Sequence, residues 1–446
     1  MEAVILAAGL GTRMRSSLAK VLHPVAGRPL IDYSLALCRE LGVEQPVVVL
    51  NPHQAEVAAH VEGRCEVVWQ REQRGTGHAL QQVPAERLGG KRVITLYGDM
   101  PLISAEWVRE VIAAQEGAAA ALIAIDHGPP SYGRIIRNAD GTLDTIVEAK
   151  DLTPDQQSIH ETNMGVYCFD GDRLVEALPR LSDDNVAREF YLTEIFRWLR
   201  PVRVIKKEAH HGETIGVNTR RELADAERWM QRALQGRLMD AGVTFVAPDT
   251  CFVEAGVEIG QDSVIEPFTI LRGATSIGAG CRIGPHVDVA DSAIGDNCAV
   301  QHSWLRGCTV GAGSDCGPFS KLRPGTEVGE RVHVGSFAEL VRTRVGPESA
   351  VPHFAYLGDA VIGARVNIAA GTITANYDGE KKNPTVIEDD VFVGVDTMLR
   401  APVRLGRGSR TGAGSVVTKD VPPGATAVGV PARVIKRSQS EGGSSK

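Results

Sequence analysis

The sequence predicts two different folds in one chain, a doubly wound α/β domain followed by a parallel β-helix of hexapeptide repeats. Three observations lead to this prediction. Up to about residue 225, short apolar runs alternate with segments of helix-spaced apolar residues. A single amphipathic segment follows, and from about residue 251 aliphatic residues recur every six positions. A chain of 446 residues is also too long for one ordinary hydrophobic core.

The first half contains five apolar runs of strand length and two longer segments with helical spacing. The runs read as buried strands of a mainly parallel sheet, which helices would cover on both faces. We expect strands at residues 3–6, 47–50, 93–96, 121–125 and 165–169, and helices at 30–41 and 106–114.

A long helix is expected between the two folds, from Thr219 to about Met239. Gly242 follows it as a stop signal. Six residues at helical spacing form its expected apolar face: Leu223, Ala226, Met230, Ala233, Leu234 and Leu238.

The second half carries the six-residue period of a parallel β-helix, in which each aliphatic residue points inward and three hexapeptides complete one turn. About 170 residues would give roughly nine or ten coils. The polar insertion at 374–385 is expected to be a loop on the binding face, and the polar tail 438–446 to be disordered. The period is clearest at Val310, Cys316, Leu322, Val328, Val334, Leu340, Val345, Val351, Leu357, Ile362 and Ile368.

Composition excludes several function classes. A net charge of −7 gives no basic footprint for nucleic acid or for an anionic membrane surface. The apolar residues 1–11 read as a first strand rather than a signal peptide, and no apolar run is long enough to span a membrane. The eight cysteines lack C-x-x-C spacing, so we expect free thiols in a reducing cytoplasm.

A glycine-rich turn at residues 6–14 follows the first strand directly. Gly9 and Gly11 let the backbone approach a phosphate chain, whose charge Arg13 and Lys20 can stabilise. The alternative is an ordinary strand-to-helix turn, since the loop matches neither the Walker pattern nor the dinucleotide fingerprint. The second strand ends in Asn51 rather than in an acidic residue, which disfavours NAD.

Two further motifs favour nucleotide chemistry. Residues 70–79, which include Gln70, Gly75 and Thr76, offer amides and backbone groups suited to a base edge. Asp99 follows a strand at its carboxyl end, where α/β sheets bind ligands. Alone it could cap a helix, but beside a phosphate loop it is a better magnesium ligand.

Taken together, these motifs resemble the bacterial family of bifunctional N-acetylglucosamine-1-phosphate uridylyltransferases/glucosamine-1-phosphate acetyltransferases, the GlmU family, from Val4 to about Pro431. The resemblance implies an α/β nucleotide-diphospho-sugar transferase (Rossmann-like) domain at 1–218, a connecting helix at 219–242 and a left-handed β-helix acetyltransferase at 243–437. It also implies a cytoplasmic homotrimer that uses Mg²⁺. The enzyme would transfer acetyl from acetyl-CoA to glucosamine-1-phosphate and then uridylyl from UTP, making UDP-N-acetylglucosamine for cell-wall peptidoglycan and lipopolysaccharide.

The resemblance also implies roles for single residues in the first domain. Arg13 and Lys20 would act on the phosphates, and Asp99 and Asn218 would hold the metal. The Tyr191/Thr193 segment would lie against the sugar. Residues that would bind UTP or the sugar nucleotide are Leu6, Ala7, Ala8, Gly9, Lys20, Gln70, Gly75, Thr76, Tyr97, Gly98, Asp99, Gly133, Glu148, Asn163 and Asn218.

In the β-helix, the resemblance makes His353 the general base that takes a proton from the attacking amine, with Glu339 orienting it or balancing its charge. A lone histidine in a solenoid is otherwise most often a surface residue. Arg323, Tyr356, Asn367 and Lys382 would bind glucosamine-1-phosphate, and Ala370, Asn376, Tyr377, Val395 and Ala413 would contact acetyl-CoA.

The sequence departs from the family at a few positions. Ala19 stands where the family has proline, with little expected consequence. Val341 replaces a lysine that helps to bind the sugar phosphate, and we expect the adjacent Arg342 to point to the opposite face. Val395 replaces a serine that contacts acetyl-CoA, and a late CoA-contacting arginine has no certain counterpart near 430–433.

These departures leave two alternatives to the bifunctional enzyme. In one, the uridylyltransferase is kept while the β-helix is a trimerising scaffold or acylates another amino sugar. In the other, the chain is a non-catalytic regulatory subunit of the same architecture, although Arg13, Lys20, Asp99 and Asn218 argue against it.

Overall fold

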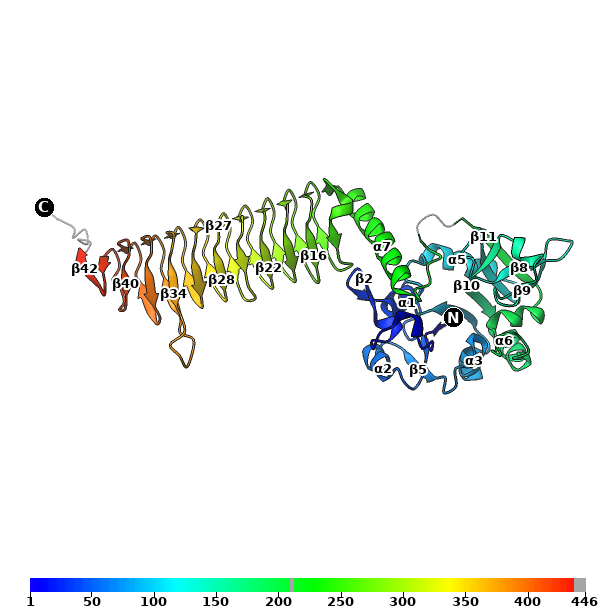
Figure 1. Ribbon diagram of the computed structural model, residues 1–446. Coiled ribbons are helices and arrows are strands. Elements are labelled where there is room, and N and C mark those ends of the chain that lie inside the picture. The colour runs from blue at the N-terminus through cyan, green and yellow to red at the C-terminus, as the bar shows by residue number, and fades with distance from the viewer. Residues whose placement is uncertain (209–211, 437–446) are drawn as a thin grey trace. The chain divides into compact units, whose positions relative to one another are not determined.

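The computed structural model describes residues 1–208 and 212–436 and contains two compact units (Figure 1). Contacts divide the chain within one helix, between Met230 and Gln231. The functional boundaries at 218 and 242 stay a prediction, and the tail 438–446 lies outside the described residues.

The first unit is a twisted sheet in the strand order β11-β7-β10-β6-β1-β4-β5, with the hairpin β8–β9 attached to β10. All five expected strands and both expected helices are confirmed, within one or two residues except for β10, which begins four residues earlier. The strands are β1 Glu2–Leu6, β4 Val47–Leu50, β5 Glu66–Trp69, β6 Arg92–Tyr97, β7 Ala120–Asp126, β8 Arg134–Arg137, β9 Leu143–Val147, β10 Glu161–Asp170 and β11 Val202–Lys207. The principal helices are α1 Leu30–Glu40, α2 Ala55–Val61, α3 Thr76–Gln81, α5 Ala105–Ala114 and α6 Gly171–Ala177.

Strand β10 is the exception to the parallel arrangement, because it lies antiparallel between β6 and β7. The other neighbours along this path are parallel, so the carboxyl ends of β1 and β6 meet at one edge. Alternate residues of β1 enter two separate hydrophobic clusters, with Val4 and Leu6 in one and Ala3 and Ile5 in the other. Both faces of the sheet are therefore covered, as near-continuous apolar strands require.

Helix α7, Arg220–Asp240, is the expected long helix. Its start is fixed by side-chain capping: the Thr219 hydroxyl accepts from the Glu222 amide (3.2 Å), while the Glu222 carboxylate accepts from the Thr219 hydroxyl and from the Asn218 backbone amide (both 2.9 Å). Of the six residues expected on its apolar face, Leu223 is half-buried and Ala233 is exposed, so the prediction for Ala233 was wrong. The buried ones are Ala226, Met230, Leu234 and Leu238.

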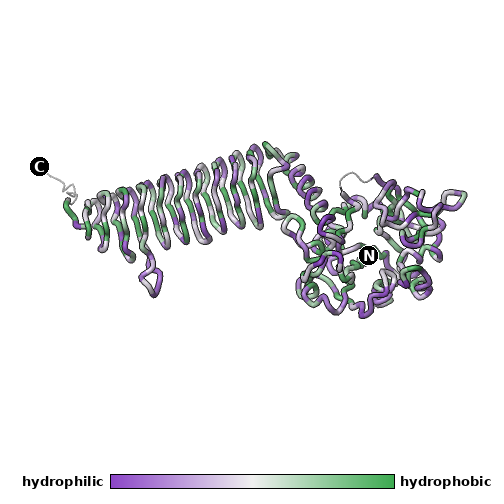
Figure 2. Tube along the Cα trace, in the orientation of Figure 1, coloured by the Kyte–Doolittle hydropathy of each residue, from purple (hydrophilic) through white to green (hydrophobic). Residues whose placement is uncertain are grey.

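The second unit is a left-handed β-helix built from three faces of 12, 10 and 9 strands. Paired strands are parallel except for the last two, β41 Thr426–Gly429 and β42 Ala432–Lys436, which are antiparallel. Hydrophobic and hydrophilic stretches alternate along each coil (Figure 2). The eleven residues that defined the six-residue period all lie in one continuous core, which confirms the inward register. Strands used below are β25 Lys321–Leu322, β27 His333–Ser336, β28 Glu339–Val341, β30 Ala350–His353, β31 Tyr356–Gly358, β33 Asn367–Ile368, β34 Ile373–Ala375, β35 Thr385–Ile387, β36 Phe392–Val393 and β39 Arg410–Thr411.

The expected insertion is a loop between β34 and β35, seen in Figure 1 as a hairpin that leaves the coil. Tyr377 and Lys382 form an antiparallel bridge across it.

The described part of the chain has no helix that is both long enough and apolar enough to cross a bilayer.

Candidate functional site

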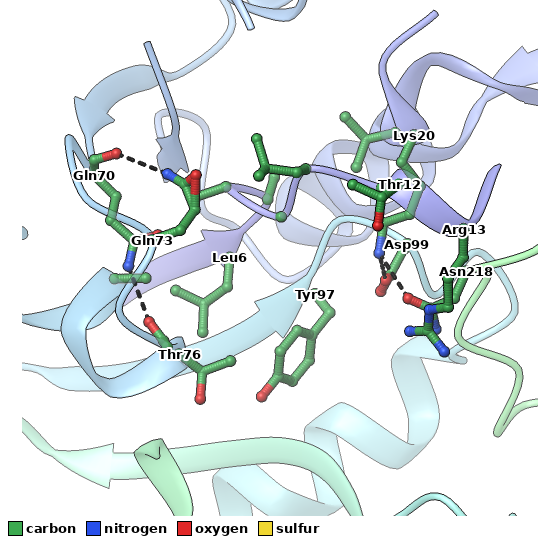
Figure 3. A pocket seen from close by; sticks show the side chains of 18 of the residues that line it. Leu6, Thr12, Arg13, Lys20, Gln70, Gln73, Thr76, Tyr97, Asp99 and Asn218 are labelled. Atoms are coloured by element: carbon green, nitrogen blue, oxygen red, sulfur yellow. Dashed lines mark hydrogen bonds and ion pairs between the residues drawn. The ribbon is translucent and has the colours of Figure 1, made fainter. Parts of the chain in front are cut away.

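The first unit contains a cavity of about 430 Å³ at the carboxyl ends of β1 and β6 (Figure 3). The glycine-rich turn forms one wall, and the start of α3 contributes to another. Twelve of the predicted residues line it: Leu6, Ala7, Ala8, Gly9, Arg13, Lys20, Gln70, Gly75, Thr76, Tyr97, Asp99 and Asn218.

The glycine-rich turn is held by two buried amides that sequence reasoning did not assign. The side chain of Asn51 donates to the carbonyl of Ala8 (2.7 Å), and that of Gln54 donates to the carbonyl of Ala7 (3.0 Å). These bonds hold the two carbonyl oxygens behind the turn, so the oxygens do not face an anion bound at its front and do not repel it. Asn51 had been noted only as evidence against NAD.

Residues 70–79, expected to face the edge of a base, are held in place by hydrogen bonds from their own side chains. Gln70 is buried and donates to the carbonyl of Gly75 (2.9 Å), while Gln73 donates to the carbonyl of Gln70 (3.2 Å). Gly75 has φ +106°, and a Cβ there would lie 2.6 Å from the carbonyl oxygen of Phe190. This close approach explains why only glycine fits, and the motif is a rigid wall of the cavity.

Lys20 lies between the two predicted metal ligands. Its ammonium forms an ion pair with Asp99 and donates to the amide oxygen of Asn218 (3.1 Å), as Figure 3 shows. These two oxygens, one of them charged, fit a hard divalent cation that keeps water or phosphate oxygens as its other ligands. Within the described residues no cluster of three or more His, Cys, Asp or Glu side chains could hold a metal.

A second cavity of about 190 Å³ adjoins the first and shares Tyr97, Asp99 and Asn218 with it. The predicted sugar residues Gly133, Glu148 and Asn163 line this cavity. Thr193 donates to the Glu148 carboxylate (2.7 Å), which connects the predicted Tyr191/Thr193 segment to the site. Burial raises the pKa of Glu148, although the bond from Thr193 opposes the shift.

Among the residues predicted to bind UTP or the sugar nucleotide, Gly98 lines neither cavity, and the predicted Tyr191 and Thr193 do not line them either. Gly98 packs into the sheet edge instead, where a Cβ would lie 2.9 Å from Ile31 and 3.0 Å from Ala7. The lining residues that sequence reasoning missed include Glu189 in the first cavity and Tyr132 and Tyr167 in the second. Tyr132 directly precedes the predicted Gly133, and Tyr167 lies four residues after the predicted Asn163, so proximity to these residues is the signal that could have found them.

We expect Gly165→Ala to impair uridylyl transfer far more than Gly141→Ala. Both glycines have left-handed backbones, with φ +86° and +82°. A Cβ at 165 would lie 2.8 Å from the Tyr97 ring, whereas a Cβ at 141 meets nothing within 4 Å. Both changes should lower stability by about 1–3 kcal/mol, but only the first moves a wall of both cavities. Pyrophosphate-release kinetics of the two variants, with thermal unfolding, measure the difference; equal rates would contradict it.

In the β-helix, four predicted residues occupy equivalent positions on successive coils. Strands β30, β33, β36 and β39 pair through Ala350, Asn367, Phe392 and Arg410. Three residues beyond each of these lie His353, Ala370, Val395 and Ala413. The backbone confirms the alignment, because Asp396 donates to the carbonyl of Ala370 and Gly414 donates to that of Val395, both at 2.7 Å. With coils about 4.8 Å apart, this row is about 14 Å long.

The neighbouring face places Lys321, Glu339 and Tyr356 side by side in register. The Glu339 carboxylate accepts from Arg323 (3.2 Å) and also forms an ion pair with Lys321 (3.5 Å). Glu339 was expected to orient His353 or to balance its charge, and that role stays a prediction; the partners of its carboxylate in this structure are these two cations. Asn367 lies on the face that carries His353.

The positions of Val341, at the end of β28, and of Val395, after β36, have clear structural contexts. Val341 is buried, and its neighbour Arg342 turns outward with φ +47°, as expected from their adjacent positions. The Arg342 guanidinium makes two bonds to Asp359 (2.6 and 2.9 Å). Asp359 also accepts from Asn376 (2.5 Å), so it ties the base of the 376–384 loop to the coil. Val395 is 45% exposed, so its side chain lies at the surface of the row.

Asp359→Asn should destabilise the β-helix by about 0.5–1 kcal/mol at neutral pH, since the pair is partly exposed. The bonds from Arg342 chiefly, and then from Asn376, hold the pKa of Asp359 below its ordinary value. A lowered pKa means that this stabilisation is complete above the unfolded-state pKa and is lost as pH falls through the lowered one. Thermal unfolding at pH 7 and at stepwise lower pH should show the difference between variant and parent shrinking in acid. A constant difference would contradict the assignment.

Comparisons with known proteins find a different family in each part of the chain. Residues 3–197 match the family model of the MobA-like NTP transferase domain. Residues 256–290 and 384–419 match that of the bacterial transferase hexapeptide (six repeats). The chain is 42% identical over 434 residues to the "Bifunctional protein GlmU" of Halalkalibacterium halodurans, covering 96% of this chain and 95% of that relative. The namesake proteins of Heliobacterium modesticaldum and Listeria welshimeri are 43% and 41% identical, again over 96% of this chain and 94% and 95% of theirs.

Proposed function

The chain belongs to the GlmU family, and from that premise we propose how its residues divide two reactions between the two units. The family activity is the synthesis of UDP-N-acetylglucosamine by an acetyltransferase and a uridylyltransferase in one chain. Both kinds of domain are present, an NTP transferase domain and hexapeptide repeats.

The uridylyl transfer takes place across the two adjoining cavities. Their shared residues Tyr97, Asp99 and Asn218 are the observation that carries this assignment. UTP binds in the larger cavity, with its phosphates along the glycine-rich turn, and the sugar phosphate binds in the smaller one. The sugar phosphate oxygen then attacks the α-phosphorus in line, and pyrophosphate leaves.

No general base is needed, because the phosphate oxygen is already a competent nucleophile. Arg13 and Lys20 stabilise the charge that develops on the α-phosphate oxygens and on the leaving pyrophosphate. Asp99 and Asn218 hold the divalent metal, which we propose is Mg²⁺. When bound, the metal neutralises phosphate charge and orients the two substrates. With Asp99 on the metal, Lys20, which bonds Asp99 and Asn218 in this structure, would be free to bond the phosphates.

The acetyl transfer takes place along the row of equivalent positions on successive coils that begins at His353. A row about 14 Å long fits the extended pantetheine arm of acetyl-CoA, with the thioester at the His353 end and Ala370, Val395 and Ala413 along it. The His353 imidazole takes a proton from the 2-amino group of glucosamine-1-phosphate as nitrogen attacks the thioester carbonyl, and CoA thiolate leaves. Arg323 and Lys382 supply positive charge for the sugar phosphate, with Tyr356 and Asn367 nearby.

The β-helix also assembles the enzyme. Hexapeptide repeats favour oligomerisation, and we propose a homotrimer in the cytoplasm, where UTP and acetyl-CoA are available. Asn376, Tyr377 and Lys382 lie on or beside the loop that leaves the coil, which supports their reaching a ligand held against a neighbouring copy.

Two product assays test the assignment on the purified full chain. CoA thiol release from acetyl-CoA and glucosamine-1-phosphate reports the acetyltransferase, and pyrophosphate release from UTP and N-acetylglucosamine-1-phosphate reports the uridylyltransferase. We expect the parent enzyme to show both activities, which would mean that Val341 and Val395 do not prevent acetyl transfer. Pyrophosphate release without CoA release would leave a uridylyltransferase whose β-helix has another substrate or only a structural role.

A further inference from the structure

Tyr167 connects the aromatic core of the first unit to the smaller cavity. Its side chain is fully buried, and its ring packs against Phe169 and Phe196 with centroid separations of 5.7 and 5.2 Å. The same residue lines the smaller cavity. A tyrosine fixed by ring packing on one side can hold its hydroxyl in one place on the other.

That hydroxyl holds the carboxamide of Asn163. The Nδ2 group donates to the Tyr167 hydroxyl at 2.6 Å, and the Gly165 amide donates to the Asn163 Oδ1 at 3.2 Å. Because a backbone amide can only donate, the Gly165 contact fixes which end of the carboxamide is oxygen. One N–H and one oxygen lone pair of Asn163 remain for a ligand in the cavity.

An irregularity in β10 makes this contact geometrically feasible. In a regular strand, residues four apart are separated by about 13 Å, too far for these two side chains to bond. The register of β10 against β7 shifts between Asn163 and Tyr167, where Asn163 pairs with Ala124 and Tyr167 with Leu122. The extra residues form a bulge that folds the two side chains toward each other. Bulges of this kind commonly re-aim side chains beside active sites.

We propose that Tyr167 is a positioning residue for sugar binding, which holds Asn163 in the orientation that bonds a polar substituent of the sugar ring. The inference rests on the proposed function, in which Asn163 faces the sugar phosphate. Burial raises the pKa of Tyr167 well above its ordinary value, so the phenol stays neutral in the working range. A neutral hydroxyl can accept from Asn163 at any such pH.

Tyr167→Phe tests the proposal with little change in packing. Without the hydroxyl, the Asn163 carboxamide loses one of its two anchors and rotates among several orientations. We expect the KM for N-acetylglucosamine-1-phosphate to rise about tenfold, the effect of one neutral hydrogen bond. The KM for UTP should change less than twofold, because the larger cavity does not include Tyr167.

Tyr33→Phe is the matched control. The Tyr33 hydroxyl also makes a short bond, to the carbonyl of Val25 (2.7 Å), and Tyr33 is not among the described residues that line either cavity. Its loss should lower thermal stability to a similar extent while leaving both KM values near those of the parent. A KM effect equal to that of Tyr167→Phe would show a general loosening and overturn the proposal.

A double-mutant cycle asks whether Tyr167 acts through Asn163. In the Asn163→Ala background, Tyr167→Phe should have almost no further effect on the sugar KM, whereas independent roles would give additive effects. Additivity, or parallel rises in both KM values, would refute the positioning role while leaving the uridylyltransferase assignment intact. An inactive parent enzyme would instead sink the proposed function, and this inference with it.

Discussion

Asp99→Ala is expected to abolish uridylyl transfer, by about 10³-fold or more, and to leave acetyl transfer within about twofold of the parent. Asp99 lines both cavities and is the one carboxylate of the proposed metal pair. Its removal takes away a charged metal ligand and also frees Lys20 from its ion pair. The Asn218 amide oxygen alone is a weak, neutral ligand, so the phosphates lose their divalent counter-charge. Pyrophosphate release and CoA release measured on one preparation give both numbers.

Asp126→Ala is the matched control for this experiment. Asp126 ends strand β7 of the same sheet with an exposed side chain, so its loss removes an acidic residue without touching either cavity. It should leave both activities unchanged. Loss of both activities in a folded Asp99→Ala variant would contradict two independent sites, because the residue belongs to the first unit only.

His353→Ala is expected to lower acetyl transfer by about 10²–10⁴-fold, the usual contribution of a general base, and to leave uridylyl transfer unchanged. His353 is exposed at the end of β30, so its removal should not disturb the core of the coil. The residue begins the row of equivalent positions that runs through Ala370, Val395 and Ala413. CoA thiol release, measured as a function of pH, gives the rate of acetyl transfer and shows whether it depends on one basic group.

His333→Ala controls for the loss of an exposed histidine on the adjacent coil. Its ring contacts Asp315 (2.6 Å), and it pairs in register with Ala350, three residues before His353. We expect parental rates for both activities. An unchanged CoA-release rate in His353→Ala would remove His353 from the mechanism and point to a role for the row in binding alone.

Local periodicity carried most of the fold prediction. Buried parallel strands and the hexapeptide coil both impose repeating patterns on neighbouring residues, and such patterns can be read from a single sequence. The strand ends were therefore predicted to within a residue or two, with β10 the exception because it starts four residues earlier. The eleven aliphatic positions of the coil were all correct. The prediction for Ala233 failed because helical spacing defines a stripe, but the width of the buried part depends on what packs against it.

The candidate site was predicted less evenly. Motif residues that follow a strand directly, such as Gly9 and Asp99, were correctly placed at the cavity, because the carboxyl ends of adjacent parallel strands meet. Gly98 sits in the same motif yet serves packing against Ile31. A glycine in a motif does not reveal whether its missing side chain makes room for a ligand or for a neighbour.

Local sequence patterns were enough to predict the two fold classes, the connecting helix and the motif residues, since periodicity and turn signals lie in neighbouring residues. The contacts between side chains far apart in the chain became visible only in the folded structure. In the folded structure, β10 lies antiparallel in the sheet, with a bulge that brings Asn163 to Tyr167. Asn51 lies behind the glycine-rich turn, and the Glu339 carboxylate contacts Arg323 and Lys321. The coil also aligns His353 with Ala413 across intervals of 17, 25 and 18 residues. Such contacts depend on strand order and loop length, which local preferences do not specify.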